Sequence, residues 1–402
     1  MQRSHPDTAP VTSFERIEEL DVLRGFALFG VFTVHFVTSL YYLYPVDEAV
    51  FSSWTEDPIQ FGLLVLCDVL FYDKAITLFS ILFGIGFWVQ MERLKSRSDA
   101  FEHIYLRRLA VLLAFGMINK FLLFPGDILV DYALLGLALF LLRGLSARAM
   151  LISGLVLMFV LSQLAYGFID SPWVDEDTLD LALETALLSE SYGSWVERLA
   201  HWHVQDNVVG LGMIPLGLFV LSRFLIGAWI ARRRLIEKAR TSRPLVAKIA
   251  AVSVSLGLAC EGLSMAIWED VWTLPDFFDF ALHAIGVPLL ALGYACLIIL
   301  MCWSARWNWL TSVFAPVGRM ALTAYISHGV LILVFAHPFG LYLRPEISPA
   351  LSWIIAIGVF LAFSLLCHLW LKTFRFGPLE WLWRSLTYGQ PQPFLRPAAK
   401  NL

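Results

Sequence analysis

Long runs of apolar residues recur along the whole chain, separated by short polar segments. Each run is about 20 residues long, which lets one helix cross about 30 Å of hydrocarbon. None alternates with the period of two that the strands of a membrane barrel require, and a helix satisfies its own backbone hydrogen bonds in lipid. The pattern therefore predicts ten membrane-spanning helices, over residues 22–44, 74–92, 106–124, 127–143, 148–169, 208–231, 246–268, 280–303, 314–338 and 350–373.

The composition agrees with this all-α, polytopic fold class. Of the 402 residues, 58% are hydrophobic and 15% are charged, and the mean hydropathy of +0.70 excludes a soluble domain built around one core. The net charge is −4 and no basic tract occurs, so no nucleic-acid partner is indicated. The five cysteines show no CxxC spacing and are expected to pack as small apolar residues, so no metal site is predicted.

The charges of the connections predict how the helices are oriented. Lys and Arg dominate the connections at 93–108, 143–148, 232–248 and 306, and the tail at 372–400. Asp and Glu dominate the alternate connections at 47–57, 170–184 and 269–279. Because positive residues favour the cytoplasmic side, both termini are expected there. The organisation is then a cytoplasmic segment over 1–21, one membrane domain over 22–373 and a cytoplasmic tail over 374–402.

The N-terminal segment is polar and mixed in charge, so we expect no cleaved signal peptide. The segment 170–207 is the only long outside connection. Two short amphipathic helices are expected in it, at 178–188 and 195–203, either capping a cavity or lying passively on the surface. Residues 59–71 are apolar but contain Gln60 and Asp68, which favours an interfacial or partly re-entrant helix.

The first span carries a polar stripe formed by Asp21, Arg24, His35 and Thr38. At 100° per residue, eleven residues bring His35 back to nearly the direction of Arg24, about 16 Å further along the helix. Ionisable groups in a bilayer are costly and by default mark a functional site or pathway. The alternative is that Asp21 and Arg24 are interfacial anchors and that His35 is a packed histidine with satisfied hydrogen bonds.

Further polar residues fall inside the predicted spans, and because buried charges usually pair, some of them are structural partners of one another. These residues are Asn119, Lys120, Asp127, Asp131, Arg223, Glu261, His283, Arg319, Thr323, Ser327, His328 and His368. No Walker loop, HExxH, GxSxG or metal-binding Cys/His spacing occurs, so ATP-driven transport and zinc-dependent hydrolysis have no support.

The string DVLRGFALFGVFTVH resembles the first helix of the multi-pass membrane acyltransferases, which carry an arginine, ten residues and then a histidine. The rest of the chain more narrowly resembles the bacterial YeiB-type membrane proteins. The matching segments are LFSILFGIGF at 78–87, GDILVDYALLG at 126–136, GRMALTAYISH at 318–328 and FGPLEWLWR at 376–384.

This resemblance implies a protein of the bacterial inner membrane. It also implies transfer of an acyl group, usually acetyl, from cytoplasmic acyl-CoA to a hydroxyl or amine of a small-molecule or glycan acceptor. In that interpretation His35 is the base that takes the acceptor's proton. Arg24 binds CoA phosphates or the thioester carbonyl, and Asp21 orients Arg24. Asn119 and Asp127 are further catalytic candidates, and Arg319 is a further donor-binding candidate because of its charge in an apolar span.

The chain departs from the YeiB-type pattern at three positions. Asn119 stands where the family often has a histidine, Ala324 where it often has an asparagine, and His328 where it often has a glutamine. These departures leave it open whether the family's chemistry is altered here. Asn119 still donates and accepts hydrogen bonds, so it can take an orienting role.

Two other function classes remain open. A transporter or flippase for a small anionic or lipid-linked solute would suit the polar stripe and the glycine-rich segments 84–86 and 210–217, although no inverted repeat is evident. The third class is a noncatalytic membrane scaffold, which the intramembrane charges disfavour. The sequence leaves the acceptor and the oligomeric state undetermined.

Overall fold

The computed structural model describes residues 17–37, 48–97, 101–162, 164, 176–205, 213–269, 271, 274–343 and 347–396. Within these residues the protein is helical, with one isolated β-bridge between Phe374 and Leu395 and no strand. The helices are α1 (Glu18–Val37), α3 (Glu48–Glu56), α4 (Pro58–Leu70), α5 (Lys74–Arg97), α6 (Phe101–Leu122), α7 (Leu129–Leu141), η2 (Leu142–Gly144), α8 (Ala147–Val156), η3 (Leu157–Leu161), α10 (Glu176–Leu187), α11 (Tyr192–Val204), α12 (Met213–Arg232), α13 (Leu235–Ala239), α14 (Arg243–Trp268), α15 (Asp276–Cys302), η5 (Ala305–Trp307), α16 (Asn308–Arg319), α17 (Ala321–Ala336), α18 (Pro349–Thr373) and α19 (Pro378–Tyr388).

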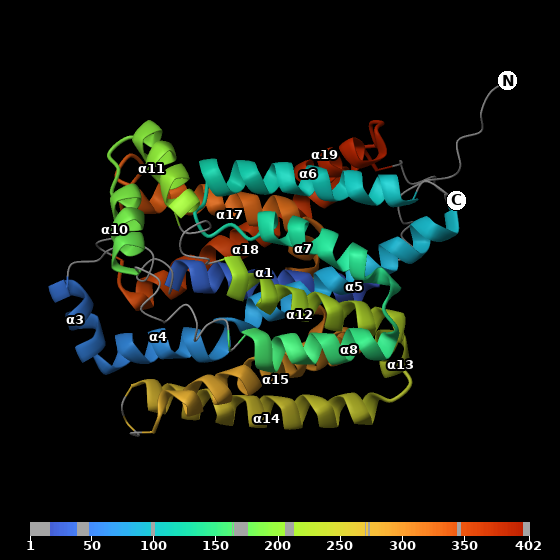
Figure 1. The fold of residues 1–402 in the computed structure, drawn as a ribbon, viewed down its shortest axis with the longest axis horizontal. Helices are drawn as coiled ribbons and strands as arrows, with labels where there is room; N and C mark the ends of the chain where they lie inside the picture. The colour runs from blue at the N-terminus through green and yellow to red at the C-terminus, as the bar shows by residue number, and fades with distance from the viewer. Residues whose placement is uncertain are drawn as a thin grey trace.

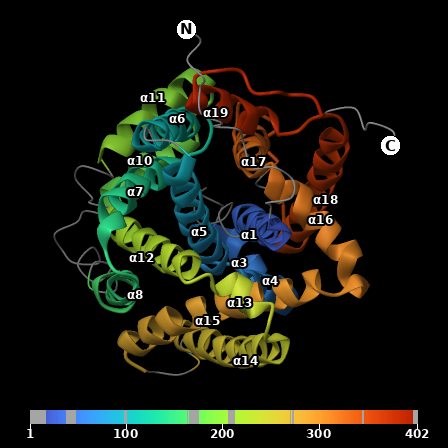
Figure 2. The same cartoon turned by 90° about the vertical axis from the view of Figure 1, so that its right-hand side faces the viewer.

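The long helices lie side by side with roughly parallel axes (Figure 1). Seen along these axes, α1 occupies the interior of the bundle (Figure 2), where it contacts α4, α5, α15, α16, α17 and α18. The hairpin of α14 and α15 forms one side of the bundle (Figure 2). The predicted all-α helical bundle is therefore confirmed, and its first span is the central helix.

Among the residues that the structure describes, five helices are long and apolar enough to cross a membrane: α1, α12 over Ile214–Arg232, α14, α15 over Phe278–Cys302, and α18. The helices α16 and α17 pass the same test together but meet at an angle of 85°, so they form one broken span or a re-entrant turn. The other predicted spans coincide with α5, α6, α7 and α8, which are shorter or carry more charge. The total of ten spans and the cytoplasmic location of the termini stay predictions.

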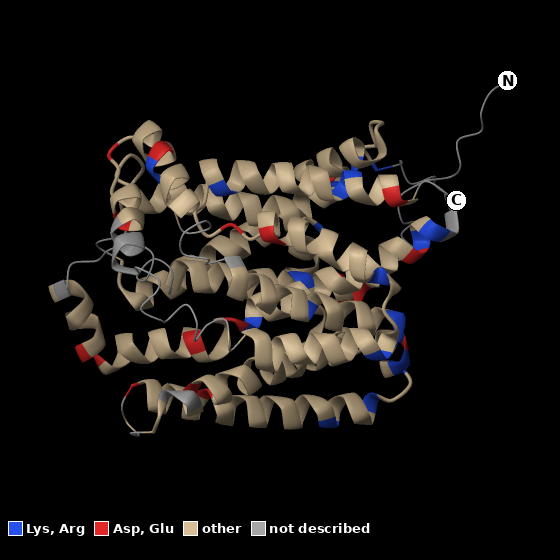
Figure 3. Ribbon diagram, in the orientation of Figure 1, with Lys and Arg blue, Asp and Glu red and all other residues tan. Residues whose placement is uncertain are grey.

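Charges are distributed unevenly along the bundle axis. Most Lys and Arg residues gather at the end that carries α13, whereas many Asp and Glu residues lie toward the opposite end (Figure 3). Glu19 at the start of α1 binds Arg240 near this basic end, with Oε1 2.7 Å from Nη2. The positive-inside rule predicts that the basic end faces the cytoplasm.

The two helices expected in the long outside connection are present. They are α10 and α11. The hydroxyl of Tyr192, the first residue of α11, donates a hydrogen bond to the carbonyl of Leu122 at the end of α6 (2.8 Å). The helix expected at 59–71 is α4, which ends at Leu70 and packs against α1, α14 and α18 within the bundle. After a break at Phe71–Asp73, α5 continues along the bundle (Figure 1).

Glycines allow α1 to approach its neighbours at backbone distance. A Cβ atom at Gly25 would collide with the carbonyl oxygen of Phe314 in α16, and one at Gly318 would collide with the carbonyl oxygen of Asp21. A Cβ atom at Gly30 would lie 2.8 Å from the Cβ of Ala75 in α5. Small residues at helix crossings are the usual means of close packing in membranes, where no hydrophobic force drives association.

We expect Gly25→Leu to lower the thermal unfolding midpoint of the detergent-purified protein strongly. The new side chain has no room at the α1–α16 crossing, and overpacking of this kind costs about 1–3 kcal/mol or more. The matched control is Gly358→Leu in α18, where an added Cβ meets nothing within 4 Å. Equal midpoints for the two variants would contradict the close crossing.

Candidate functional site

His35 of α1 contacts His328 of α17. The Nδ1 atom of His35 lies 3.2 Å from Nε2 of His328, and the two rings stack with centroids 4.7 Å apart. His328 is fully buried, whereas His35 is partly accessible. Thr38, the last member of the predicted polar stripe, lies outside the described residues.

Aromatic rings surround this histidine pair. Phe32 lies 4.6 Å from the His328 ring between centroids, and Phe124 lies 4.8 Å from the ring of His35. Phe36 and Tyr325 also pack near His328, at 5.9 and 6.5 Å. The rings bury His328, and electrostatic interactions are stronger in such an apolar environment.

Asn119 and Asp127 form a second contact beside the first. The side-chain amide of Asn119 donates to Oδ1 of Asp127 (2.6 Å), and both residues are buried. Oδ2 of Asp127 accepts the backbone N–H of Val130 (3.1 Å), so this carboxylate caps the first turn of α7. The hydroxyl of Tyr325 accepts the backbone N–H of Ile128 (3.1 Å), which directly precedes α7.

Two buried polar atoms in this region have no hydrogen-bond partner among the described residues: Nδ1 of His328 and Oδ1 of Asn119. A Cβ atom at Gly329, the residue after His328, would lie 3.2 Å from Oδ1 of Asn119 and 3.1 Å from Cβ of Phe124. Gly329 therefore keeps open the space beside Asn119. Because a buried polar atom without a partner is costly, these two atoms indicate a place for a water molecule or a substrate group.

The histidine contact restricts the protons of both rings. When both imidazoles are neutral, one proton lies between the two nitrogens. If Nδ1 of His35 carries it, Nε2 of His35 has a lone pair and His328 is protonated on Nδ1. Nε2 of His35 has no hydrogen-bond partner among the described residues, so in this tautomer it can accept a proton from a substrate.

The predicted donor-binding residues lie at the other end of α1. Arg24 donates from Nη1 to Oδ1 of Asp21 (3.2 Å), one helical turn earlier. Its other terminal nitrogen faces Gly86 of α5, 3.4 Å from the position of a Cβ there. Gly318 of α16 lies against the backbone of Asp21, and Arg319 is the next residue of that helix. The candidate residues therefore form two separate groups. The catalytic candidates His35, Asn119 and Asp127 lie at one end of α1, and the donor-binding candidates lie at the other end.

Sequence reasoning missed the contact between His35 and His328. It noted His328 only as a departure from the YeiB-type pattern and as one polar residue of a predicted span. The available signal was that an uncommon intramembrane histidine occurred in each of two spans, but no pattern within one helix predicts which helices touch.

Glu380 of α19 caps the broken end of α17. Its Oε1 accepts the backbone N–H groups of Leu322 (2.7 Å) and Thr323 (3.0 Å), and its Oε2 accepts the hydroxyl of Thr323 (2.6 Å). A carboxylate at a helix N-terminus satisfies the first free donors and the helix dipole. Two of the motifs that carried the YeiB-type resemblance, at 318–328 and 376–384, therefore meet here.

A separate ionic cluster surrounds the break between α4 and α5. Lys74 forms an ion pair with Glu261 of α14 and donates to the carbonyl of Asp68 (2.9 Å). His283 of α15 contacts both Glu261 and Asp73, at 3.2 Å each. Lys74 and Glu261 are buried, whereas Asp73 and His283 are about one-third exposed, at 30% and 35%.

Metal binding receives no support from the part of the chain that the structure describes, because no group of three or more His, Cys, Asp or Glu side chains there is arranged to hold an ion.

Comparison with known proteins identifies the family. A protein named "Uncharacterized protein YxaH" from Bacillus subtilis (strain 168) is 32% identical over 409 aligned residues, which cover 96% of this chain and 98% of that protein. The sequence profile described as "Protein of unknown function (DUF418)" matches residues 230–390. The chain belongs to the DUF418 family. The matched range holds both α17 and its cap, Glu380.

Two further relatives extend over nearly the full length. "Uncharacterized 39.9 kDa protein in amylase 3'region" from Bacillus acidopullulyticus is 30% identical, covering 96% of this chain and 98% of that protein. "Uncharacterized protein YeiB" from Escherichia coli (strain K12) is 27% identical, covering 94% and 98%. The resemblance to YeiB-type proteins is confirmed, and the resemblance to acyltransferases stays a prediction.

We expect Glu380→Ala to destabilise the protein by about 1–2 kcal/mol, because loss of a cap leaves the first N–H groups of α17 unsatisfied. The measurement is the thermal unfolding midpoint in detergent, with Glu237→Ala, an exposed residue of α13, as the matched control. A midpoint for Glu380→Ala as high as that of the control would show that the cap contributes nothing.

Proposed function

We propose that this protein is a membrane-embedded acyltransferase. It would move an acyl group, usually acetyl, from cytoplasmic acyl-CoA to a hydroxyl or amine of an envelope-associated acceptor. The observation that carries the proposal is the contact between His35 and His328, which leaves Nε2 of a partly accessible histidine without a partner among the described residues.

A hydroxyl is a weak nucleophile and needs a base within hydrogen-bond reach. In the proposed reaction the acceptor oxygen forms a bond to the thioester carbonyl carbon while Nε2 of His35 accepts the hydroxyl proton. The carbon–sulfur bond then breaks, and the CoA thiolate leaves and takes up that proton. His328 acts as a positioning residue, because its contact fixes the orientation of the His35 ring.

Asn119 and Asp127 support the same arrangement from the other side. Asp127 fixes the amide of Asn119, so Oδ1 of Asn119 points into the bundle as an acceptor. A water molecule or the acceptor hydroxyl would link this atom to Nδ1 of His328. Such a link would favour the tautomer in which Nε2 of His35 is the base.

Arg24 is the proposed donor-binding residue, with Asp21 orienting it and Arg319 as a second cation. Its planar guanidinium suits a phosphate or a polarised carbonyl. Arg24 and His35 are about 16 Å apart along α1, so either a pantetheine arm spans this distance or the acyl group is relayed.

The test measures acetyl-CoA binding and acetyl transfer by the full-length protein in nanodiscs, over a panel of acceptor sugars and amines. We expect His35→Ala to lower turnover by about 10²–10⁴-fold, the usual contribution of a general base, and to leave acetyl-CoA binding largely intact. The matched control is His368→Ala, an exposed histidine of α18. Full turnover by His35→Ala would overturn the assignment of the base.

The same preparation tests the donor site. We expect Arg24→Ala to weaken acetyl-CoA binding by about tenfold, since a charge-assisted hydrogen bond to an anion is lost. Arg243→Ala, which removes an exposed arginine of the basic end, is the control. Absence of saturable binding of acetyl-CoA and of longer acyl-CoAs by the folded wild-type protein would overturn the acyltransferase itself.

The ionic cluster around Lys74 favours a second candidate, transport of a small anionic or lipid-linked solute. Helices broken inside the membrane, with their backbone carbonyls turned toward charged groups, are typical of transporter binding sites. Here the carbonyls at the end of α4 accept hydrogen bonds from Lys74 and from the hydroxyl of Tyr294 (3.0 Å to Leu70).

A double substitution separates transport from a structural role of this cluster. Removing one partner of a buried ion pair costs about 3–5 kcal/mol, whereas replacing both with apolar residues is often neutral. We therefore expect Lys74→Met with Glu261→Leu to fold normally and to abolish uptake of labelled acetate and phosphate into proteoliposomes. Normal uptake by the double variant, or no uptake by the wild type, would exclude this role for the cluster.

A further inference from the structure

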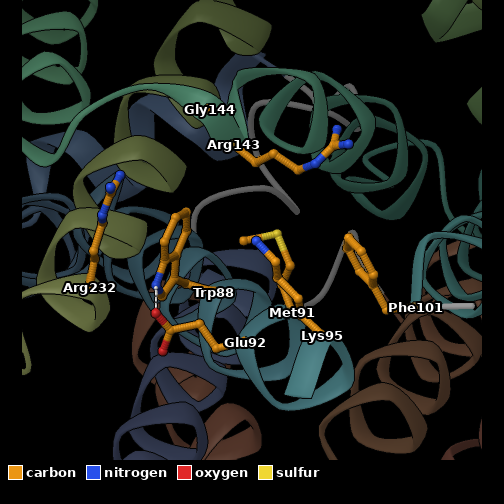
Figure 4. Close-up of a pocket in the computed structure, with 8 residues that line it drawn as sticks. All are labelled: Trp88, Met91, Glu92, Lys95, Phe101, Arg143, Gly144 and Arg232. Carbon is orange, nitrogen blue, oxygen red and sulfur yellow. Dashed lines mark hydrogen bonds between the residues drawn. The ribbon is translucent and has the colours of Figure 1, made fainter. Parts of the chain in front are cut away.

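A cavity of about 540 Å³ opens at the basic end of the bundle, outside the site described above. It lies between the ends of α5, α7 and α12 and the start of α6. Its lining residues are Trp88, Met91, Glu92, Lys95, Phe101, Arg143, Gly144 and Arg232. Figure 4 shows Trp88 and Arg232 on one side, Met91 and Lys95 in the middle, and Arg143 and Phe101 on the other side.

The cavity is separated from Arg24 by α5 itself. Gly86 is the residue of α5 that faces Arg24. At 100° per residue, the four lining residues of α5 lie about 140–240° around the helix from Gly86. They therefore occupy the opposite face of α5, and a ligand in this cavity would not contact the polar stripe of α1.

Packing holds the two arginines of the cavity in place without using all their donors. Arg143 donates to the carbonyl of Phe140 (3.0 Å) and to Glu102 (2.6 Å), and its guanidinium stacks on the ring of Phe140. Arg232 donates to the carbonyl of Leu145 (2.5 Å). A guanidinium has five N–H donors, so each arginine keeps donors available for a ligand.

The remaining charges leave an excess of positive charge in the lining. Lys95 is exposed and makes no hydrogen bond to another described residue, so its three donors are available. The one carboxylate of the lining, Glu92, accepts the indole N–H of Trp88 (2.9 Å) and so turns toward Trp88. Three cations thus face one carboxylate around a space of ligand size.

We propose that this cavity is a second ligand site, which binds the phosphate group of a phosphate ester at the basic end of the protein. Arg143 and Arg232 would supply fixed N–H donors, Lys95 a mobile ammonium group, and the rings of Trp88 and Phe101 an apolar wall for the rest of the ligand. Arginine and lysine together are the usual recognition set for phosphate. The ester is either a soluble nucleotide or the headgroup of an anionic phospholipid, which basic pockets between helix ends also bind.

The experiment uses the full-length protein in phosphatidylcholine nanodiscs, which carry no net charge. The soluble probe is adenosine 5′-phosphate and the lipid probe is dihexanoylphosphatidylglycerol, each titrated at low and high salt. We expect saturable binding of at least one probe, weakened by salt because the contact is ionic. The probe that binds identifies the source of the phosphate.

The decisive variant is Lys95→Glu, which reverses a charge without breaking any hydrogen bond to the described residues. It should weaken binding by about tenfold, roughly 1.4 kcal/mol. Lys248→Glu makes the same change at an exposed position of α14 and should have no effect. No saturable binding of either probe, or equal losses in the two glutamate variants, would overturn the proposal.

Discussion

The close approach of α1 to α16 and α5 is the constraint on which the other features depend. Gly25, Gly30 and Gly318 let backbone meet backbone, and α1 thereby becomes the helix around which the bundle is arranged. Any larger residue at Gly25 or Gly318 would push α16 outward. Since α17 follows α16 after an 85° bend, the position of His328 opposite His35 depends on the same crossing.

Charged side chains inside this bundle bind the backbone groups that helix breaks leave free. Each break in a helix exposes free backbone groups, and a charged side chain satisfies them: Glu380 at the start of α17, Asp127 at the start of α7, and Lys74 at the end of α4. In lipid an unsatisfied backbone group costs several kcal/mol. Several intramembrane charges are therefore explained by the breaks themselves. The partly accessible His35, Nδ1 of His328 and Oδ1 of Asn119 are not explained in this way, so they carry the functional argument.

The sequence predicted the helices well, because their signal is local. Apolar runs and basic connections located ten helical ranges, and the i, i+3 contact of Asp21 with Arg24 follows from helix geometry alone. The contacts between helices were beyond such reasoning. Nothing in the local pattern indicates that Lys74 pairs with Glu261, or that Glu380 of the predicted tail enters the bundle to cap α17. The sharp bend within the ninth range, where α16 ends at Arg319 and α17 starts at Ala321, was also missed, although Pro316 and Gly318 lie just before it.

The contact of His35 with His328 gives a physical meaning to the departures from the YeiB-type pattern. That resemblance leads one to expect an imidazole where this chain has Asn119 and an amide where it has His328. Gly329, adjacent to His328, borders the amide oxygen of Asn119, so the two positions face the same small space. An imidazole and an amide have then exchanged places between these two positions. The same types of hydrogen-bond donor and acceptor therefore surround His35 in this chain as in the YeiB-type pattern. On this argument the departures at Asn119 and His328 redistribute the groups that orient His35 and do not remove them, whereas the departure at Ala324 is not part of this exchange.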